Sequence, residues 1–157
     1  MSVAPEIARL AEAVLLVPVP ALAPAPAPTL GTLAGQLRML AATPERWWGL
    51  VRFNPDRSVK IGVEDHPAYQ AWLMVLPPGD AGLDCDCDVA TIIAGEATEG
   101  IPGSPVLRPG PTRVHGQRHR LHGRGAGYSI SLHARAQRPV TQRPVTQRQI
   151  HRPAIWK

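Results

Sequence analysis

The sequence predicts an all-β domain, a small sandwich or barrel, with one or two short helices before it. Short runs of alternating or β-branched residues recur between residues 58 and 134, and turns rich in Gly and Pro separate them. The chain holds 18 Pro and 14 Gly among 157 residues, which favours short elements over long helices. This length suits one domain with a real core. The expected strands are SVKIGV, YQAWLMVL, VATIIAG, TRVHG and GYSISLHA.

The first residues predict a short helix followed by a spacer. Residues 5–17 carry apolar side chains at helical spacing. The stretch VPVPALAPAPAPTL comes next, and its alternating Pro and Ala suit an extended, polyproline-type linker. We therefore assign residues 1–29 to an N-terminal helix and a Pro/Ala-rich linker.

A second helix is predicted around Leu33, Leu37 and Leu40, because their spacing places them on one helical face. Thr29 or Thr32 can cap its N-terminus with a side-chain oxygen. This helix comes directly before the predicted strands, so we expect it to pack against them.

Charge is divided sharply along the chain. Residues 1–99 hold all 12 acidic side chains and six basic ones, a formal charge of −6, whereas residues 100–157 hold 11 basic side chains and no acid. A strip of Arg and His between residues 113 and 124 has the composition of a phosphate-binding surface, but no RNP-like aromatic pattern accompanies it. Nucleic acid is therefore not the expected partner. Residues 137–157 are basic and Pro-interrupted, which predicts a disordered tail.

The sequence also bears on location. No stretch is apolar over the length that a membrane span needs. The apolar start of the chain lacks a basic region before it, and Glu6 and Glu12 interrupt it, which is unlike a signal peptide. We expect a cytoplasmic monomer that does not bind membranes.

Five segments together resemble one known family, the bacterial cysteine dioxygenase type of cupin. The likeness runs from about Leu30 to Ala136, and the order and spacing of the segments match, which is more specific than any one segment. The segments are PERWWGLVRFNPDR, AYQAWLMVLPPGDAGL, IIAGEATEG, RVHGQRH and GYSISLHA. The resemblance implies a single small cupin (double-stranded β-helix) barrel over residues 30–136.

The resemblance also implies a chemistry. Such proteins hold one non-haem Fe(II) on three histidines and add both atoms of O2 to a small thiol, giving a sulfinate. Here the implied substrate is L-cysteine or a related thiol. Imidazole suits ferrous iron, and two ligands on one strand must be two residues apart, because alternate side chains share a face.

This sequence departs from the family at the metal positions. The positions that match the family's His-x-His pair are Asp84 and Asp86, so the implied metal ligands are Asp84, Asp86 and His119. If the alignment with the family shifts in the irregular region near residue 120, His122 matches the third ligand position in place of His119. Carboxylate and imidazole ligands together can bind iron, but the site is more anionic than the family's.

Three further positions follow from the resemblance. Ser131 and His133 match a pair that orients the substrate and tunes oxygen chemistry, although Arg135 stands where the family has Tyr. Lys60 matches the basic residue that holds the substrate carboxylate, as a point charge without the two-pronged geometry of Arg.

Alternatives remain open. A register shift by one residue turns Cys85 and Cys87 inward, and with His119 and His122 they form a set of two sulfurs and two nitrogens that favours zinc. The altered ligands also fit a degenerate, catalytically inactive cupin that binds a small acid or a metal. Finally, the D-C-D-C-D stretch is also consistent with a plain solvated turn.

Overall fold

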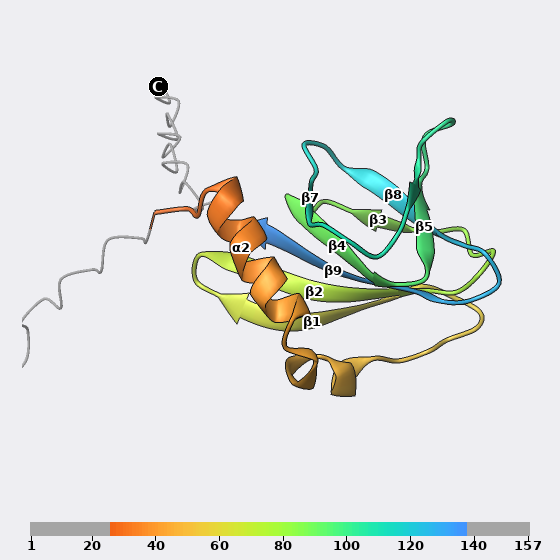
Figure 1. Ribbon diagram of the computed structural model, residues 1–157, viewed down its shortest axis with the longest axis horizontal. Helices are drawn as coiled ribbons and strands as arrows, with labels where there is room; N and C mark the ends of the chain where they lie inside the picture. The colour runs from red at the N-terminus through yellow and green to blue at the C-terminus, as the bar shows by residue number, and fades with distance from the viewer. Residues whose placement is uncertain (1–25, 138–157) are drawn as a thin grey trace, which may run out of the picture.

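The computed structural model describes residues 26–137. Within this range, two antiparallel sheets face each other and one helix precedes them, which confirms the predicted fold class (Figure 1). The strand orders are β1-β2-β9-β4-β7 in the five-stranded sheet and β3-β8-β5-β6 in the four-stranded sheet. The predicted helix over residues 5–17, nearly all of the linker and the tail after Gln137 lie outside the described residues, so these assignments stay predictions.

The elements follow in a regular order along the chain. The helical elements are α2 (Leu30–Ala41) and the 3-10 turns η1 (Pro44–Arg46) and η2 (Trp48–Leu50). The five-stranded sheet contains β1 (Val59–His66), β2 (Tyr69–Leu76), β4 (Val89–Ala94), β7 (Arg113–Val114) and β9 (Ser129–Ala136). The four-stranded sheet contains β3 (Leu83–Cys85), β5 (Glu96–Glu99), β6 (Val106–Leu107) and β8 (His119–Arg124).

Helix α2 covers the outer face of the five-stranded sheet. Thr29 is its N-cap, and the Thr29 side chain accepts a hydrogen bond from the backbone N–H of Thr32 at 3.1 Å, as one of the two predicted caps. The predicted apolar face is confirmed, because Leu33, Leu37 and Leu40 are buried against the sheet. Their sheet partners in this first core include alternate residues of β2 and β9, among them Leu73, Val75, Ile130 and Leu132.

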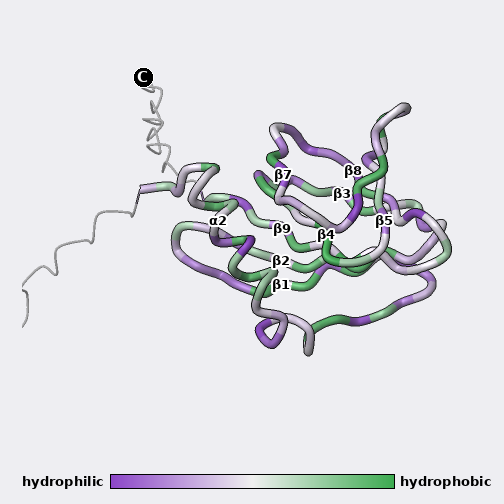
Figure 2. The backbone as a smooth tube through the Cα atoms, viewed as in Figure 1, coloured by the Kyte–Doolittle hydropathy of each residue, from purple (hydrophilic) through white to green (hydrophobic). Residues whose placement is uncertain are grey.

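A second core fills the space between the two sheets. It contains the other set of alternate residues on β2, namely Trp72, Met74 and Leu76, together with Leu121 from β8. Cys85 and Cys87 belong to this core as well. Figure 2 shows hydrophobic residues along the central strands β2 and β4 and hydrophilic ones along β8. The cysteines therefore lie inside the domain, where the two sheets meet.

The chain changes sheets at two points that determine the site. Between β3 and β4 it crosses from the four-stranded to the five-stranded sheet through residues 86–88. It returns between β4 and β5 at Gly95, whose φ is +72°. A side chain there would meet the Tyr128 carbonyl oxygen at 2.2 Å from its Cβ, so only glycine fits this turn.

The region around residue 120 is more regular than the sequence predicted. Residues 119–124 form β8, which pairs with both β3 and β5. Residues 96–99 form β5, which was not among the predicted strands. Within residues 26–137, no helix has the length and hydrophobicity that crossing a membrane requires.

Candidate metal centre

The D-C-D-C-D segment alternates between the inside and the outside of the domain. Cys85 is 0% exposed and Cys87 is 3% exposed, whereas the side chains of Asp84 and Asp86 are 43% and 47% exposed. This pattern is what an extended chain produces, because successive side chains point to opposite faces. The structure thus has the register in which the cysteines, and not the acids, face the core.

Three histidines from different parts of the chain approach these cysteines. His119 is the cross-strand partner of Cys85 in the β3–β8 pair, so both side chains lie on the same inner face. His133 is fully buried on β9, and His115 follows β7. We call Cys85, Cys87, His115, His119 and His133 the Cys/His cluster.

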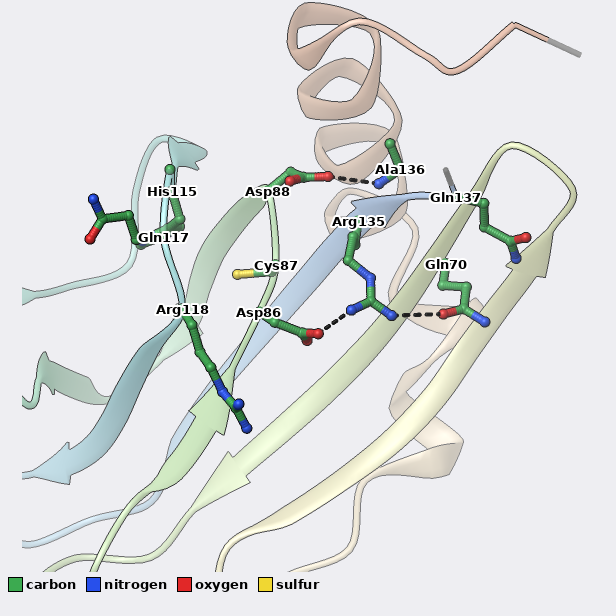
Figure 3. Close-up of a pocket in the computed structure, with 11 residues that line it drawn as sticks. Gln70, Asp86, Cys87, Asp88, His115, Gln117, Arg118, Arg135, Ala136 and Gln137 are labelled. Atoms are coloured by element: carbon green, nitrogen blue, oxygen red, sulfur yellow. Dashed lines mark hydrogen bonds and ion pairs between the residues drawn. The ribbon is translucent and has the colours of Figure 1, made fainter. Parts of the chain in front are cut away.

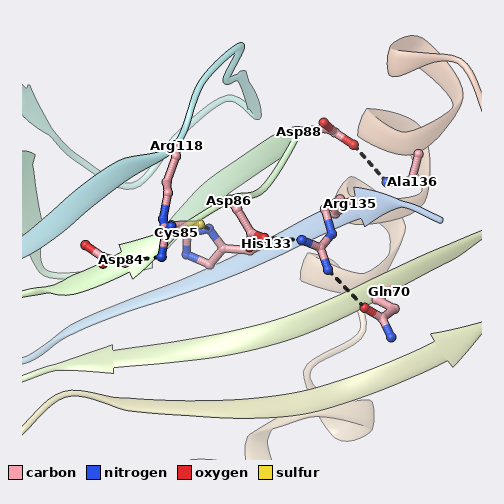
Figure 4. A network of polar contacts seen from close by, with 9 residues as sticks. All are labelled: Gln70, Asp84, Cys85, Asp86, Asp88, Arg118, His133, Arg135 and Ala136. Atoms are coloured by element: carbon pink, nitrogen blue, oxygen red, sulfur yellow. Dashed lines mark hydrogen bonds and ion pairs between the residues drawn. The ribbon is translucent and has the colours of Figure 1, made fainter. Parts of the chain in front are cut away.

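The cluster has the spacing of a metal site. The ligand atoms of Cys85, Cys87 and His133 lie within 4.8 Å of one another, and so do those of Cys87, His115 and His119. Cys87 is common to both sets. Nδ1 of His133 lies 3.3 Å from the sulfur of Cys85 and 3.3 Å from that of Cys87, as Figure 4 shows for Cys85. Five potential donors therefore surround one small volume.

Hydrogen bonds on the far side of two imidazoles determine which nitrogen faces the cluster. Nδ1 of His115 lies 3.2 Å from a carboxylate oxygen of Glu99 on β5. Nδ1 of His119 lies 3.0 Å from the Gln117 carbonyl oxygen, to which it can donate. In both rings Nε2 is then the nitrogen with a free lone pair, an arrangement that metal-binding histidines commonly have.

Nε2 of His119 is buried and has no hydrogen-bond partner among the described residues. A buried polar atom without a partner costs about 1–3 kcal/mol, so such atoms are rare in stable domains. A metal ion in the cluster gives this nitrogen the partner that it lacks.

The interaction between the two cysteine thiols shifts their pKa values in opposite directions. The contact with Cys87, aided by His119 and His133, lowers the pKa of the Cys85 thiol, while the same contact with Cys85 raises the pKa of the Cys87 thiol. The nearby Cys85 thiol raises the pKa of His119, whereas burial lowers the pKa of His115. A lowered pKa of Cys85 favours its thiolate, the form in which cysteine binds metals.

The predicted ligands Asp84 and Asp86 lie on the outer side of the segment. Asp84 accepts a hydrogen bond from Nε of Arg120 at 2.8 Å. Asp86 is paired with Arg135, as Figure 4 shows. The structure therefore does not bring the predicted set of Asp84, Asp86 and His119 together. The physical reason is the one-residue difference in register, which exchanges the two faces of an extended segment.

His119 lies in the cluster, as both metal hypotheses expected, whereas His122 does not. Alternate residues of β8 face inward, and His122 lies on the opposite face, beside Gly82 and Gly100. The two cysteines and His119 of the zinc alternative all belong to the cluster. Cys87 groups with His115 and His119 in one set and with Cys85 and His133 in the other, and His122 is in neither.

The other predicted site residues lie in two separate places, with Ser131 and His133 at the cluster and Lys60 in a different pocket. Ser131 and His133 are both buried, and their side chains lie 2.8 Å apart between Oγ and Nε2, so the predicted pair forms. Lys60 lies 4.1 Å above the Trp72 ring, and that ring stacks on His133 with centroids 5.9 Å apart. Lys60 and Trp72 line a separate pocket of about 450 Å³.

A larger pocket opens directly over the cluster. Its volume is about 530 Å³, and its wall combines Cys87 and His115 with the cations Arg118 and Arg135 (Figure 3). Arg135 also lies 3.5 Å from the Gln70 side-chain oxygen. We call this space the arginine pocket. It connects the cluster with the outside of the domain.

Sequence reasoning missed His115, Glu99 and the role of Arg135. His115 and His119 are four residues apart in an irregular segment, and no regular period relates them to Cys85. Only the crossing of the chain between sheets brings them together. The one signal available was that Arg135 follows Ser131 and His133 at the two-residue spacing of one strand face.

Comparison with known proteins identifies no family for this chain. No protein-family model and no curated protein sequence matches the chain. Among solved structures, it is similar to TT1209 from Thermus thermophilus, with 25% identity, a TM-score of 0.49 and coverage of 59% of this chain and 94% of the other.

Two further structures make the type of fold explicit. One is a conserved protein with a double-stranded β-helix domain from Klebsiella pneumoniae (18% identity, TM-score 0.46, coverage 54% and 80%). The other is a cupin domain from Bordetella pertussis (16% identity, TM-score 0.42, coverage 55% and 100%). The structural neighbours are thus cupin (double-stranded β-helix) proteins. Because these TM-scores lie below 0.5, no activity is carried over from them to this chain.

Proposed function

We propose that the protein binds a metal ion in the Cys/His cluster and a small carboxylate-bearing ligand in the arginine pocket above it. The observation that carries the proposal is that Cys87 and His115 share one pocket wall with Arg118 and Arg135. Ligand pockets are typically concave, with a few converging polar groups, and guanidinium groups suit carboxylates. The two cations give the pocket its chemical preference.

Neither arginine is held by a buried partner. Arg118 is 75% exposed and lies 3.6 Å from Asp84, which is already bound by Arg120 at 2.8 Å. Arg135 is paired with Asp86, whose side chain is 47% exposed. An exposed ion pair contributes little stability, so a ligand carboxylate can replace Asp86 on Arg135 at small cost.

The remaining carboxylate of the pocket does not compete for the arginines. Asp88 accepts a hydrogen bond from the backbone N–H of Ala136 at 2.8 Å (Figure 3). This contact fixes the Asp88 side chain at the end of β9. Asp88 is therefore held by the backbone and not by either arginine, which leaves the arginines available to an anionic ligand.

Calorimetric titration of metal-loaded protein tests this assignment. L-Cysteine and cysteamine are the probes, because cysteamine has the same thiol and amine without the carboxylate. The Arg135→Gln variant should bind L-cysteine about tenfold more weakly, the size of one lost charge-assisted contact, and bind cysteamine as before. Arg124→Gln, a change at an exposed arginine of β8, is the matched control.

Two results contradict the ligand assignment. If Arg135→Gln leaves the affinity for L-cysteine unchanged, the arginine does not hold the carboxylate. If the affinity for both probes falls together, the arginine acts through the structure of the pocket and not through the carboxylate.

Dioxygenation of a small thiol is the second candidate function. It is favoured by the Ser131–His133 pair beside the cysteine sulfurs and by the imidazoles around the same volume. The reaction converts a thiol into a sulfinic acid with both atoms of O2 added to sulfur. Sulfur gives up four electrons and O2 takes up four, so no other reductant is needed.

Oxygen uptake with L-cysteine distinguishes an active enzyme from a binding protein. The enzyme hypothesis expects cysteine-dependent uptake with one sulfinate formed for each O2, and loss of the rate in His119→Ala. His122→Ala is the control, because His122 lies on the opposite face of the same strand. No uptake by Fe(II)-loaded wild-type protein would rule out this candidate and leave the binding function.

A further inference from the structure

We propose that the ion is zinc, held by the sulfurs of Cys85 and Cys87 and by Nε2 of His115 and His119. This inference deepens the proposed function, since it requires that the cluster binds a metal. It differs from the ferrous site on three histidines that the family resemblance implies. The difference follows from the donors that the fold brings together.

The donor set does not fit the implied iron site. Three neutral imidazoles leave a metal its full positive charge, but here two cysteines occupy the same inner volume as the imidazoles. Thiolates are soft donors and select zinc and related ions, and two sulfurs with two imidazole nitrogens are a common zinc set. The aspartates that match the family's histidine positions point away from this volume.

The choice of His115 and His119 follows from their outer contacts. Glu99 binds Nδ1 of His115 at 3.2 Å, and the Gln117 carbonyl binds Nδ1 of His119 at 3.0 Å. Each ring thereby keeps Nε2 for a metal on the side of Cys87, and Nε2 of His119 has no hydrogen-bond partner within the described part of the chain. A carboxylate or carbonyl behind the ring also makes imidazole a better ligand.

His133 has a different role in this arrangement. Its Nε2 faces Ser131 at 2.8 Å, and its Nδ1 lies 3.3 Å from both sulfurs. When the Ser131 hydroxyl donates to Nε2, the proton of His133 is on Nδ1 and points to both sulfurs. His133 then donates hydrogen bonds to two metal-bound thiolates, a contact that stabilises their negative charge.

The site also matches the charge balance of a zinc centre. Two thiolates neutralise the two positive charges of the ion, so the buried centre is electrically neutral and suits the apolar core around Trp72 and Leu121. Four protein ligands complete the coordination of the ion, which then lies within the core. The arginine pocket then attracts anions through its arginines rather than through the metal.

Cobalt titration of the reduced full-length chain tests the proposal. Co(II) substitutes for zinc and has visible bands that report tetrahedral geometry, while bound thiolate adds a near-ultraviolet charge-transfer band. We expect one Co(II) per chain with intense visible bands and the sulfur band. Cys85→Ser should reduce the sulfur band by about half, and the Cys85→Ser/Cys87→Ser double variant should abolish it, since each thiolate contributes separately.

Three histidine variants test which nitrogens bind the metal. His119→Ala should weaken Co(II) binding by at least tenfold. His122→Ala should change neither the affinity nor the spectrum. His133→Ala should keep the stoichiometry and shift the sulfur band, because it removes a hydrogen bond to the thiolates and not a ligand.

The wild-type spectrum alone decides the outcome if a variant fails to fold. Co(II) uptake with weak, octahedral-type bands and no sulfur band would overturn the zinc–thiolate site and leave the metal-binding proposal in place. Absence of Co(II) uptake would overturn both. Loss of stoichiometric binding in His133→Ala would move the site to the set of Cys85, Cys87 and His133.

Discussion

The two faces of the five-stranded sheet carry different chemistry. On β9, Ile130, Leu132 and Ala134 pack toward the helix, while Ser131 and His133 point into the space between the sheets. The outer face is mainly apolar, with the buried Thr91 among its residues, and the inner face combines apolar residues with the Cys/His cluster. One strand thus separates the residues that stabilise the fold from those that can bind a ligand.

Residues on the inner face can change while the packing on the helix side remains. The helix-side core contains none of the residues of the Cys/His cluster, so substitutions on the inner face leave most of the apolar packing in place. Stability and chemistry should therefore respond to different substitutions.

The largest expected effect on stability comes from breaking the helix-side core. Leu37 is 1% exposed, and Leu37→Ala should lower the free energy of unfolding by about 3 kcal/mol, because it removes packed methyl groups and leaves a cavity. Chemical denaturation measures this change. The amount of zinc bound per folded chain should stay the same.

Met39→Ala is the matched control, since Met39 lies on the same helix with 65% exposure and should change stability by no more than about 0.5 kcal/mol. If Leu37→Ala abolished zinc binding in the folded chain, the two faces would not be independent.

A smaller effect is expected on the inner face from Glu99→Gln. The change removes the negative charge behind His115, so zinc affinity should fall about tenfold, while the metal-free protein keeps its stability. Competition with a chromophoric chelator measures the affinity. Glu96→Gln, on the same strand but paired with Arg108 at 2.7 Å, should leave it unchanged. Equal effects of the two variants would contradict a specific role for Glu99.

Loss of the N-cap of α2 should lower the stability of the helix side by a smaller amount. Thr29→Ala removes the acceptor for the Thr32 N–H and should cost about 1 kcal/mol of unfolding free energy. Thr29→Ser keeps a hydroxyl at this position and should restore most of the stability in thermal unfolding. A similar loss in both variants would show that the cap oxygen is not what matters.

The smallest expected effect on stability involves Asp80, which lies away from both faces of the five-stranded sheet. Asp80 accepts a hydrogen bond from the Ser58 backbone N–H at 2.9 Å, and the Ser58 hydroxyl also donates to it. The hydroxyl contact is the main cause that lowers the pKa of Asp80. Because the pKa is lower in the folded chain, this contribution is present above the ordinary pKa near 4 and is lost as the pH falls.

Ser58→Ala should therefore reduce stability by about 0.5 kcal/mol at pH 7, a value that allows for solvent around the carboxylate. The difference from wild type should shrink as the pH falls below 4. Urea unfolding at several pH values measures it, and a difference that persists unchanged at low pH would contradict the assignment to Asp80.

The strands with clear patterns could be predicted from the sequence. The run YQAWLMVL coincides with β2, and the leucine spacing of α2 gave the buried face of the helix. These elements were predictable because local hydrophobic period and burial agree. β5 and β8 were harder, because β5 is a short run with two acidic residues and β8 is rich in His and Arg, and both lack the strong β-branched content of the central strands.

The site was predictable only in part. The Ser131–His133 pair follows from the two-residue period of one strand, and His119 was placed correctly inside. The exchange of Asp84 and Asp86 for Cys85 and Cys87 depends on a one-residue register, which the segment's strict alternation of acids and cysteines leaves undetermined. His115 reaches the cluster through tertiary structure alone.

Zinc K-edge X-ray absorption of the zinc-loaded wild-type chain tests the central claim most directly. Zinc on Cys85, Cys87, His115 and His119 should show two sulfur neighbours at about 2.3 Å and two nitrogen neighbours at about 2.0–2.1 Å. A shell of nitrogen and oxygen neighbours without sulfur would contradict it, because the inward-facing cysteines would then not be ligands.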